Sequence, residues 1–141
     1  EFLAAREKYG DWIVQYGYEP NRSVYCRWLR RGAVVISTAL QENFGLAVVE
    51  AVSAGCLPLL PRRLAYPEVI PVAYHAQCLY QDQADLVSKL ARIITDPGRL
   101  SDLSQALAAR MEKYAWENQI DAYDDLLTSL ADRRTGVLTD L

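Results

Sequence analysis

Residues 33–61 read AVVISTALQENFGLAVVEAVSAGCLPLLP, and this stretch decides the fold. Residues 33–37 (AVVIS) are apolar on both faces, which is typical of a central parallel strand that helices cover on each side. Residues 46–55 (LAVVEAVSAG) have the character of a helix ending at Gly55, and residues 56–60 (CLPLL) form the next buried run. A strand, a helix and a strand with short connections predict a right-handed crossover and a parallel sheet.

The segments on either side extend this α/β pattern. Upstream we expect a helix over residues 1–9, a short strand over 12–16 that closes at Gly17, and a helix over 23–31 with Asn21 as its N-cap and Gly32 at its end. Downstream we expect a short strand over 77–81, a helix over 84–95, a helix that starts at Asp96-Pro97 with Leu103, Leu107, Met111 and Tyr114 on one face, and a last helix with a stripe of Ile120, Tyr123, Leu127 and Leu130. The sequence therefore predicts three or four parallel strands flanked by helices, with a helical C-terminus.

Length, charge and cysteine usage exclude several classes of protein. The 141 residues fit one domain, residues 1–141, which we expect to be truncated because the sequence opens on Glu1 rather than Met. A net charge of −3 argues against a protein whose main task is to neutralise nucleic-acid phosphates. The three cysteines have neither disulfide nor zinc spacing, which indicates free thiols and a cytoplasmic location. No run approaches the roughly 18 apolar residues of a membrane span.

The loop after residues 33–37 holds the residues best suited to bind a ligand or take part in a reaction. Ligands of open parallel sheets lie beyond the carboxyl ends of the strands, and this loop lies there. Gly45 allows close backbone approach, and the amides of Phe44, Gly45 and Leu46 belong to a helix start that suits acceptor oxygens. Glu42 and Glu50 stand on either side of this start, seven residues apart. If both carboxylates face one cleft, they can hold the hydroxyls of a diol.

A second interpretation of these acids stays open from spacing alone. An acidic residue near a helix start is stabilised by the helix dipole without any ligand, so Glu42 and Glu50 could be ordinary helix-start acids with Gly45 as a turn residue. The complete string of residues, rather than the two acids, favours the site.

That string resembles the nucleotide-sugar domain of family 4 retaining glycosyltransferases, which have the two-domain GT-B fold. The matching residues are Glu42, Phe44-Gly45, Glu50-Ala51, Gly55, Pro58 and Pro67-Glu68, with Gly17-Tyr18 upstream and Tyr114 to Asn118 downstream. The resemblance implies a C-terminal nucleotide-sugar domain with a partial Rossmann-like parallel sheet. Within that family the wording around Ser37-Thr38, Gly55-Cys56 and Tyr66-Pro67-Glu68 is most similar to the tRNA-queuosine α-mannosyltransferase group, which implies GDP-mannose as donor and a queuosine tRNA as acceptor.

The resemblance also implies a role for each matching residue. Glu42 would hold a hydroxyl of the reacting hexose as the catalytic-site residue, and the backbone of Asn43, Phe44, Gly45 and Leu46 would bind sugar hydroxyls or phosphate oxygens. Glu50 would hold the ribose diol, with Gly17 and Tyr18 against the nucleobase. Transfer would retain the anomeric configuration. No cofactor or metal is expected, since the Asp-x-Asp motif of metal-dependent glycosyltransferases is absent.

The chain departs from the family pattern in one respect. It has no counterpart of the Arg and Lys that clamp the donor diphosphate in the family, and the resemblance implies an N-terminal acceptor domain that we expect to lie outside these residues. We therefore expect residues 1–141 alone to bind donor weakly and to be inactive.

The residues leave two other functions open. A lipid or polysaccharide glycosyltransferase of the same family and a non-catalytic nucleotide-binding module remain alternatives, whereas a dinucleotide-dependent dehydrogenase lacks the GxGxxG motif. His75 is expected to be a surface or half-buried polar residue rather than a catalytic one. Arg62-Arg63 are expected to be either a solvated pair or a contact for phosphate or the tRNA backbone, and Trp28 and Trp116 to be core residues.

Overall fold

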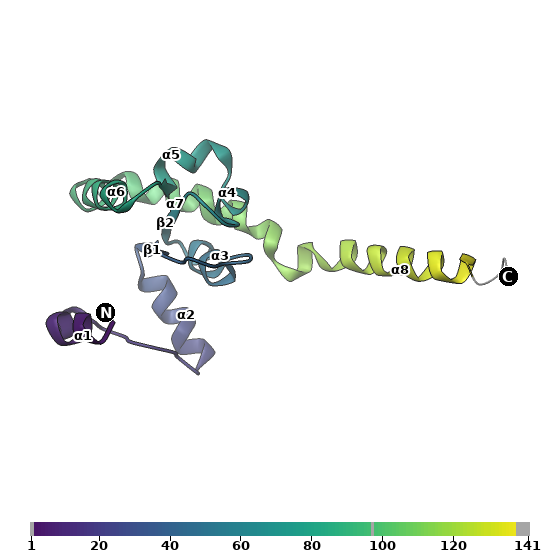
Figure 1. The fold of residues 1–141 in the computed structure, drawn as a ribbon, viewed down its shortest axis with the longest axis horizontal. Coiled ribbons are helices and arrows are strands. Elements are labelled where there is room, and N and C mark those ends of the chain that lie inside the picture. Colours follow the sequence, from purple (N-terminus) through teal and green to yellow (C-terminus); the bar gives the residue numbers. More distant parts are fainter. Residues whose placement is uncertain (1, 97, 138–141) are drawn as a thin grey trace.

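The computed structural model describes residues 2–96 and 98–137, which form a small parallel sheet surrounded by helices (Figure 1). The three strands are β1 (Val34–Ile36), β2 (Leu57–Pro61) and β3 (Leu79–Tyr80). They are parallel in the order β1-β2-β3, so β2 is the central strand. The α/β fold with a parallel sheet, which the sequence predicts, is confirmed.

The helices surround this sheet and continue well beyond it. In chain order they are α1 (Phe2–Tyr9), α2 (Arg22–Arg31), α3 (Leu46–Ser53), α4 (Tyr66–Val69), α5 (His75–Cys78), α6 (Gln83–Thr95), α7 (Gly98–Met111) and α8 (Ile120–Val137), with short 3₁₀ turns at 10–12, 72–74, 112–114 and 116–118. Figure 1 shows α8 extending away from the sheet and α1 lying apart from it near the N-terminus. None of the helices described here combines the length and the apolar character needed to cross a bilayer.

The core lies between β2, α3 and α7. All five residues of β2 are buried, and Val35 of β1 pairs with Pro58 while Leu60 pairs with Leu79 of β3. From α3, Val52 is fully buried, and from α7, Leu107 is fully buried. Burying a side chain of this size stabilises the fold by roughly 1.5–3 kcal/mol, so this layer fixes α3 and the turn before it.

The helix boundaries follow the capping residues that the sequence offers. The Asn21 side chain accepts hydrogen bonds from the N–H groups of Ser23 (3.0 Å) and Val24 (3.2 Å), and the Gly32 N–H donates to Leu29 O (3.1 Å) at the other end of α2. Both predicted boundaries are confirmed. The predicted start at Asp96-Pro97 is only partly testable, because Pro97 lies outside the described residues. Asp96 itself is the C-cap that follows α6, and its N–H donates to Arg92 O.

The predicted strand over residues 12–16 is wrong. Residues 10–12 form a 3₁₀ turn, and Trp12 and Val14 are 84% and 72% exposed. An apolar run becomes a strand only where another strand lies beside it to share hydrogen bonds. Among the described residues this run has no such neighbour.

The prediction that Trp116 lies in the core is also wrong. Trp116 is 62% exposed and stacks on Tyr123 with ring centroids 5.9 Å apart. The apolar stripe of α8 is exposed too, with Leu127 at 62% and Leu130 at 47%. Helical spacing shows which residues of α8 share an apolar face. It does not show whether another element packs against that face, and here the face stays exposed.

Candidate functional site

The turn between β1 and α3 closes around the carboxylate of Glu42. Glu42 Oε1 accepts hydrogen bonds from the N–H groups of Asn43 (3.0 Å), Phe44 (3.3 Å) and Gly45 (2.9 Å). Gly45 precedes α3 in the left-handed conformation (φ 88°, ψ 40°), which a residue without a Cβ adopts at no steric cost. A carboxylate at the positive end of a helix is stabilised by the dipole and by charge-assisted hydrogen bonds.

This geometry changes the expected role of the turn amides. The sequence suggested amides open to ligand oxygens, but those of Asn43, Phe44 and Gly45 already donate to the chain's own Glu42. The next N–H, that of Leu46, belongs to the first turn of α3, where amides have no intrahelical acceptor. Glu42 is thus a helix-start acid in this structure, and its second oxygen, Oε2, takes no part in these three bonds.

Two tyrosines hold the base of this turn: Tyr66, which the sequence brings forward only through the family resemblance, and Tyr80, which it does not single out. Tyr66 Oη and Ser37 Oγ form a hydrogen bond of 2.7 Å, and Tyr80 Oη donates to Ser37 O at 2.7 Å. Burial raises the pKa of Tyr80, so its phenol stays a donor. Ser37 follows β1 and Tyr80 ends β3, and a parallel sheet brings such carboxyl ends to one edge. For Tyr80 the available signal was its position near the carboxyl end of the predicted strand over residues 77–81.

The turn is also held from its other sides. Arg63 Nη2 donates to Ala39 O at 3.0 Å, which ties the loop after β1 to the loop after β2. Phe44 packs edge-on against Tyr114, with ring centroids 5.1 Å apart. One arginine of the predicted Arg62-Arg63 pair therefore has a structural contact with the turn.

A cavity of about 580 Å³ opens beside α2 and α3. It is lined by Gln15, Gly17, Tyr18, Glu19, Pro20, Arg22, Tyr25, Trp28, Leu29 and Glu50. Its volume lies within the roughly 300–1,000 Å³ of small-molecule sites. Three of the sequence-predicted site residues, Gly17, Tyr18 and Glu50, meet here. Glu42 is not among the lining residues of this cavity.

Glu50 enters this cavity held by two groups of α2. Arg22 Nη1 lies 3.1 Å from Glu50 Oε1, and the Tyr25 hydroxyl donates to Glu50 Oε2 at 2.8 Å. The Glu50 side chain remains 25% exposed and the Arg22 side chain 76%. The carboxylate is therefore oriented by the protein and still reachable from solvent.

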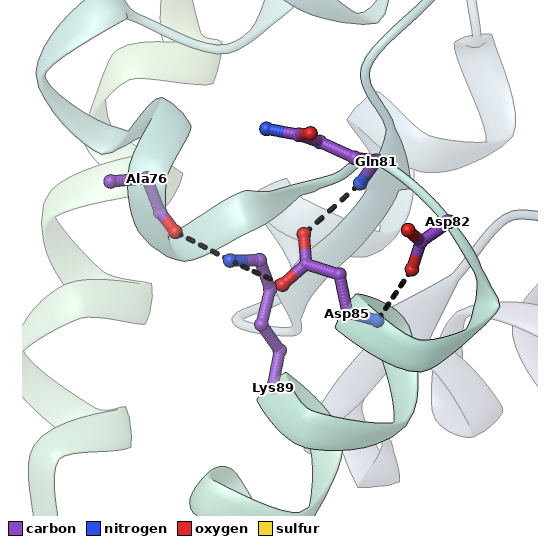
Figure 2. Close-up of polar contacts among 5 residues, drawn as sticks. All are labelled: Ala76, Gln81, Asp82, Asp85 and Lys89. Atoms are coloured by element: carbon purple, nitrogen blue, oxygen red, sulfur yellow. Dashed lines mark hydrogen bonds and ion pairs between the residues drawn. The ribbon is translucent and has the colours of Figure 1, made fainter.

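A second cavity, of about 450 Å³, is a weaker candidate. It reaches Leu57, the first residue of β2, together with Lys89 and Arg92 of α6. Figure 2 shows how Lys89 is engaged: its Nζ donates to Ala76 O (2.9 Å) and pairs with Asp85 Oδ1 (3.2 Å). The cavity lies at the amino end of the central strand, whereas ligands of open parallel sheets bind at the carboxyl ends.

Asp85 itself serves the start of α6 in this second region. It accepts from the Gln81 N–H (3.0 Å), and this backbone hydrogen bond, followed by the contact with Lys89, lowers the pKa of its carboxyl group. Its own N–H donates to Asp82 Oδ1 at 2.8 Å, which caps the helix (Figure 2). These groups are explained by helix capping.

The remaining titratable and metal-binding candidates are explained by the fold. His75 is half-buried, as predicted, and its Nε2 lies 2.8 Å from Ile70 O and 3.1 Å from Pro67 O. Cys26, Cys56 and Cys78 are free thiols, as predicted. Within residues 2–96 and 98–137 there is no cluster of three or more His, Cys, Asp or Glu side chains arranged to hold a metal ion.

Three curated glycosyltransferases are similar to this chain. The chain is 40% identical over 90 residues to the tRNA-queuosine alpha-mannosyltransferase of Drosophila melanogaster, a match that covers 64% of this chain and 22% of that protein. It is 26% identical over 126 residues to a D-inositol 3-phosphate glycosyltransferase of Streptomyces bingchenggensis, covering 88% of this chain and 27% of that protein. A D-inositol 3-phosphate glycosyltransferase of Streptomyces avermitilis matches at 26% over 129 residues, covering 90% of this chain and 27% of that protein. The chain thus spans about a quarter of the length of these curated relatives, and no family model matches it.

Proposed function

We propose that this chain is the nucleotide-sugar-binding part of a cytoplasmic, retaining glycosyltransferase of family 4 with the GT-B fold. In this proposal the enzyme moves mannose from GDP-mannose to the queuosine base of a tRNA without a metal. The observation that carries the proposal is the 40% identity over 90 residues to a tRNA-queuosine alpha-mannosyltransferase. The free cysteines are consistent with the reducing environment of the cytoplasm.

The cavity beside α2 supplies the chemistry that a nucleoside needs. Glu50 offers carboxylate oxygens to the ribose 2′- and 3′-hydroxyls, because a carboxylate accepts several hydrogen bonds. Tyr18, which is 88% exposed, offers an aromatic face to the base, and Gly17 lets the backbone approach it. All three line the same cavity.

The turn before α3 supplies the contacts for the sugar and the diphosphate. Glu42 Oε2 is the carboxylate oxygen that can accept from a hexose hydroxyl, while Oε1 fixes the turn. Negative charge develops on the departing diphosphate during transfer, and the positive end of α3 together with Arg63, which contacts the turn at Ala39 O, can stabilise it. In this proposal the backbone amides of Asn43 to Leu46 bind sugar hydroxyls or phosphate oxygens. The acceptor site belongs to the rest of the protein, so residues 1–141 alone should not turn over.

Sugar transfer by the full-length protein tests the proposal. Purified enzyme is incubated with GDP-mannose and queuosine-containing tRNA, and the digested nucleosides are examined by mass spectrometry for an added hexose. We expect mannosyl-queuosine with the natural protein, at least tenfold less with Glu42→Ala or Glu50→Ala, and no change with Asp125→Ala, an exposed acid of α8. Undiminished transfer by Glu42→Ala would remove Glu42 from the site.

A different acceptor is the second candidate function. It is favoured by the two D-inositol 3-phosphate glycosyltransferases, whose matches cover more of this chain than the mannosyltransferase match does. The same assay is run with UDP-glucose as alternative donor and with inositol 3-phosphate, lipid or glycan as alternative acceptors. Hexose found on any of these, with none on the tRNA, would favour this candidate.

A further inference from the structure

Glu50 is the one acid of the nucleoside-sized cavity whose two oxygens are both held by the preceding helix. Arg22 Nη1 contacts Oε1 (3.1 Å) and Tyr25 Oη donates to Oε2 (2.8 Å), and all three residues line the cavity. A glutamate side chain otherwise samples several rotamers, so these contacts choose the direction in which its free lone pairs point. Each oxygen retains acceptor capacity for a further hydrogen bond.

The two contacts differ in strength. The Arg22 side chain is 76% exposed, and an ion pair in that setting is weakened by solvent and salt. Tyr25 is half-buried, and burial, followed by the hydrogen bond to Glu50 and its charge, raises the pKa of Tyr25 to about 12. The phenol therefore remains a neutral donor at every physiological pH.

We propose that Tyr25 is a positioning residue that aims the Glu50 carboxylate at a ribose 2′,3′-diol and so makes the cavity prefer ribonucleotides over 2′-deoxyribonucleotides. This inference rests on the proposed function, because it requires that the cavity binds the nucleoside of the donor. A correctly aimed carboxylate accepts from both hydroxyls at once, and a misaimed one accepts from one at most. Loss of aim therefore weakens ribonucleotide binding but leaves deoxyribonucleotide binding nearly unchanged.

Calorimetric titration of the full-length protein tests this inference. GDP and 2′-deoxy-GDP, and then UDP and 2′-deoxy-UDP, are titrated into the natural protein, and the tighter-binding pair is used for the variants. Tyr25→Phe removes only the hydroxyl and keeps the ring. We expect it to weaken ribonucleotide binding about fivefold and deoxyribonucleotide binding less than twofold, which is the size of effect expected for one hydrogen bond to a charged group acting indirectly.

Three further variants separate positioning from a general structural effect. Tyr74→Phe, a partly buried tyrosine that packs against the core, is the matched control and should leave both affinities unchanged. Arg22→Ala should change the ribo/deoxyribo ratio less than twofold. In a Glu50→Ala background, Tyr25→Phe should have no additional effect, because the carboxylate that it positions is gone.

The outcomes distinguish the inference from the proposed function. Binding of neither GDP nor UDP by the natural protein overturns both. Binding of one nucleotide with an unchanged ribo/deoxyribo ratio in Tyr25→Phe overturns the inference alone, and so does an equal loss of both affinities. A ratio that depends on Arg22 instead of Tyr25 also overturns it. If Tyr25→Phe does not fold, the ratio of ribonucleotide to deoxyribonucleotide affinity in the other two variants tests the inference. An altered ratio in Arg22→Ala contradicts the inference, and so does an unaltered ratio in Glu50→Ala.

Discussion

Replacing Gly45 by alanine should destabilise the protein by two separable effects. The first is conformational: at φ +88° a residue with a Cβ costs about 1–2 kcal/mol. The second is steric, because the new Cβ would lie 3.1 Å from Cε1 of Tyr66. The Tyr66 ring is buried and its hydroxyl is bonded to Ser37 Oγ at 2.7 Å, so it has little room to withdraw. Overpacking of this kind adds about 1 kcal/mol at the low end of its range.

Gly55→Ala is the matched control for this prediction. Gly55 also has positive φ, +102°, but its Cβ would meet nothing within 4 Å, so it pays only the conformational cost. Urea unfolding of the full-length protein should give a loss of about 2–3 kcal/mol for Gly45→Ala and about 1–2 kcal/mol for Gly55→Ala. Equal losses in the two variants would refute the steric part of the reasoning, and no loss in Gly45→Ala would refute both parts.

Three further predictions concern single side chains. Glu42→Ala leaves three turn amides without their acceptor and should cost about 0.5–2 kcal/mol in urea unfolding, whereas Glu42→Gln keeps an acceptor oxygen and should cost less; an equal cost would mean that the negative charge matters more than the acceptor. Burial raises the pKa of Cys78 from 9.0 to about 12, so the folded state keeps a proton that the unfolded state releases, and stability should fall by about 1.4 kcal/mol per pH unit above pH 9; urea midpoints between pH 8 and 10.5 should fall less steeply in Cys78→Ala. Gly32→Ala places a Cβ 2.9 Å from Cys56 Sγ and should cost about 1–3 kcal/mol, most of which Cys56→Ala in the same chain should restore; additive losses in the double variant would show that this contact is not the cause.

Local signals predicted the parts of the fold that depend on neighbours in sequence. The cap at Asn21, the end of α2 at Gly32 and the buried strand β2 were all readable, because each depends on hydrogen bonds or burial within a few residues. The run over residues 12–16 was misread because strand formation depends on a partner strand that no local pattern reveals. Trp116 was misread for the related reason that helical spacing shows a face but not what covers it.

The candidate site was predictable in composition and not in geometry. The sequence brought forward Gly17, Tyr18 and Glu50, which the structure gathers in one cavity. It did not reveal Tyr25 as the partner of Glu50, since a tyrosine inside an amphipathic helix looks like a packing residue. Nor could it decide between a ligand and Glu42 as the acceptor for the turn amides, because both supply the same kind of oxygen.

Because Glu42 Oε1 occupies the amides of the turn before α3, a ligand can bind these amides only by displacing the carboxylate. An incoming oxygen can reach the N–H groups of Asn43, Phe44 and Gly45 only as Glu42 Oε1 leaves them. The affinity of the turn for a phosphate or hydroxyl is thus a difference between two sets of hydrogen bonds and not a sum. The same carboxylate is then ready to reclaim its donors, which favours rapid departure of whatever displaced it.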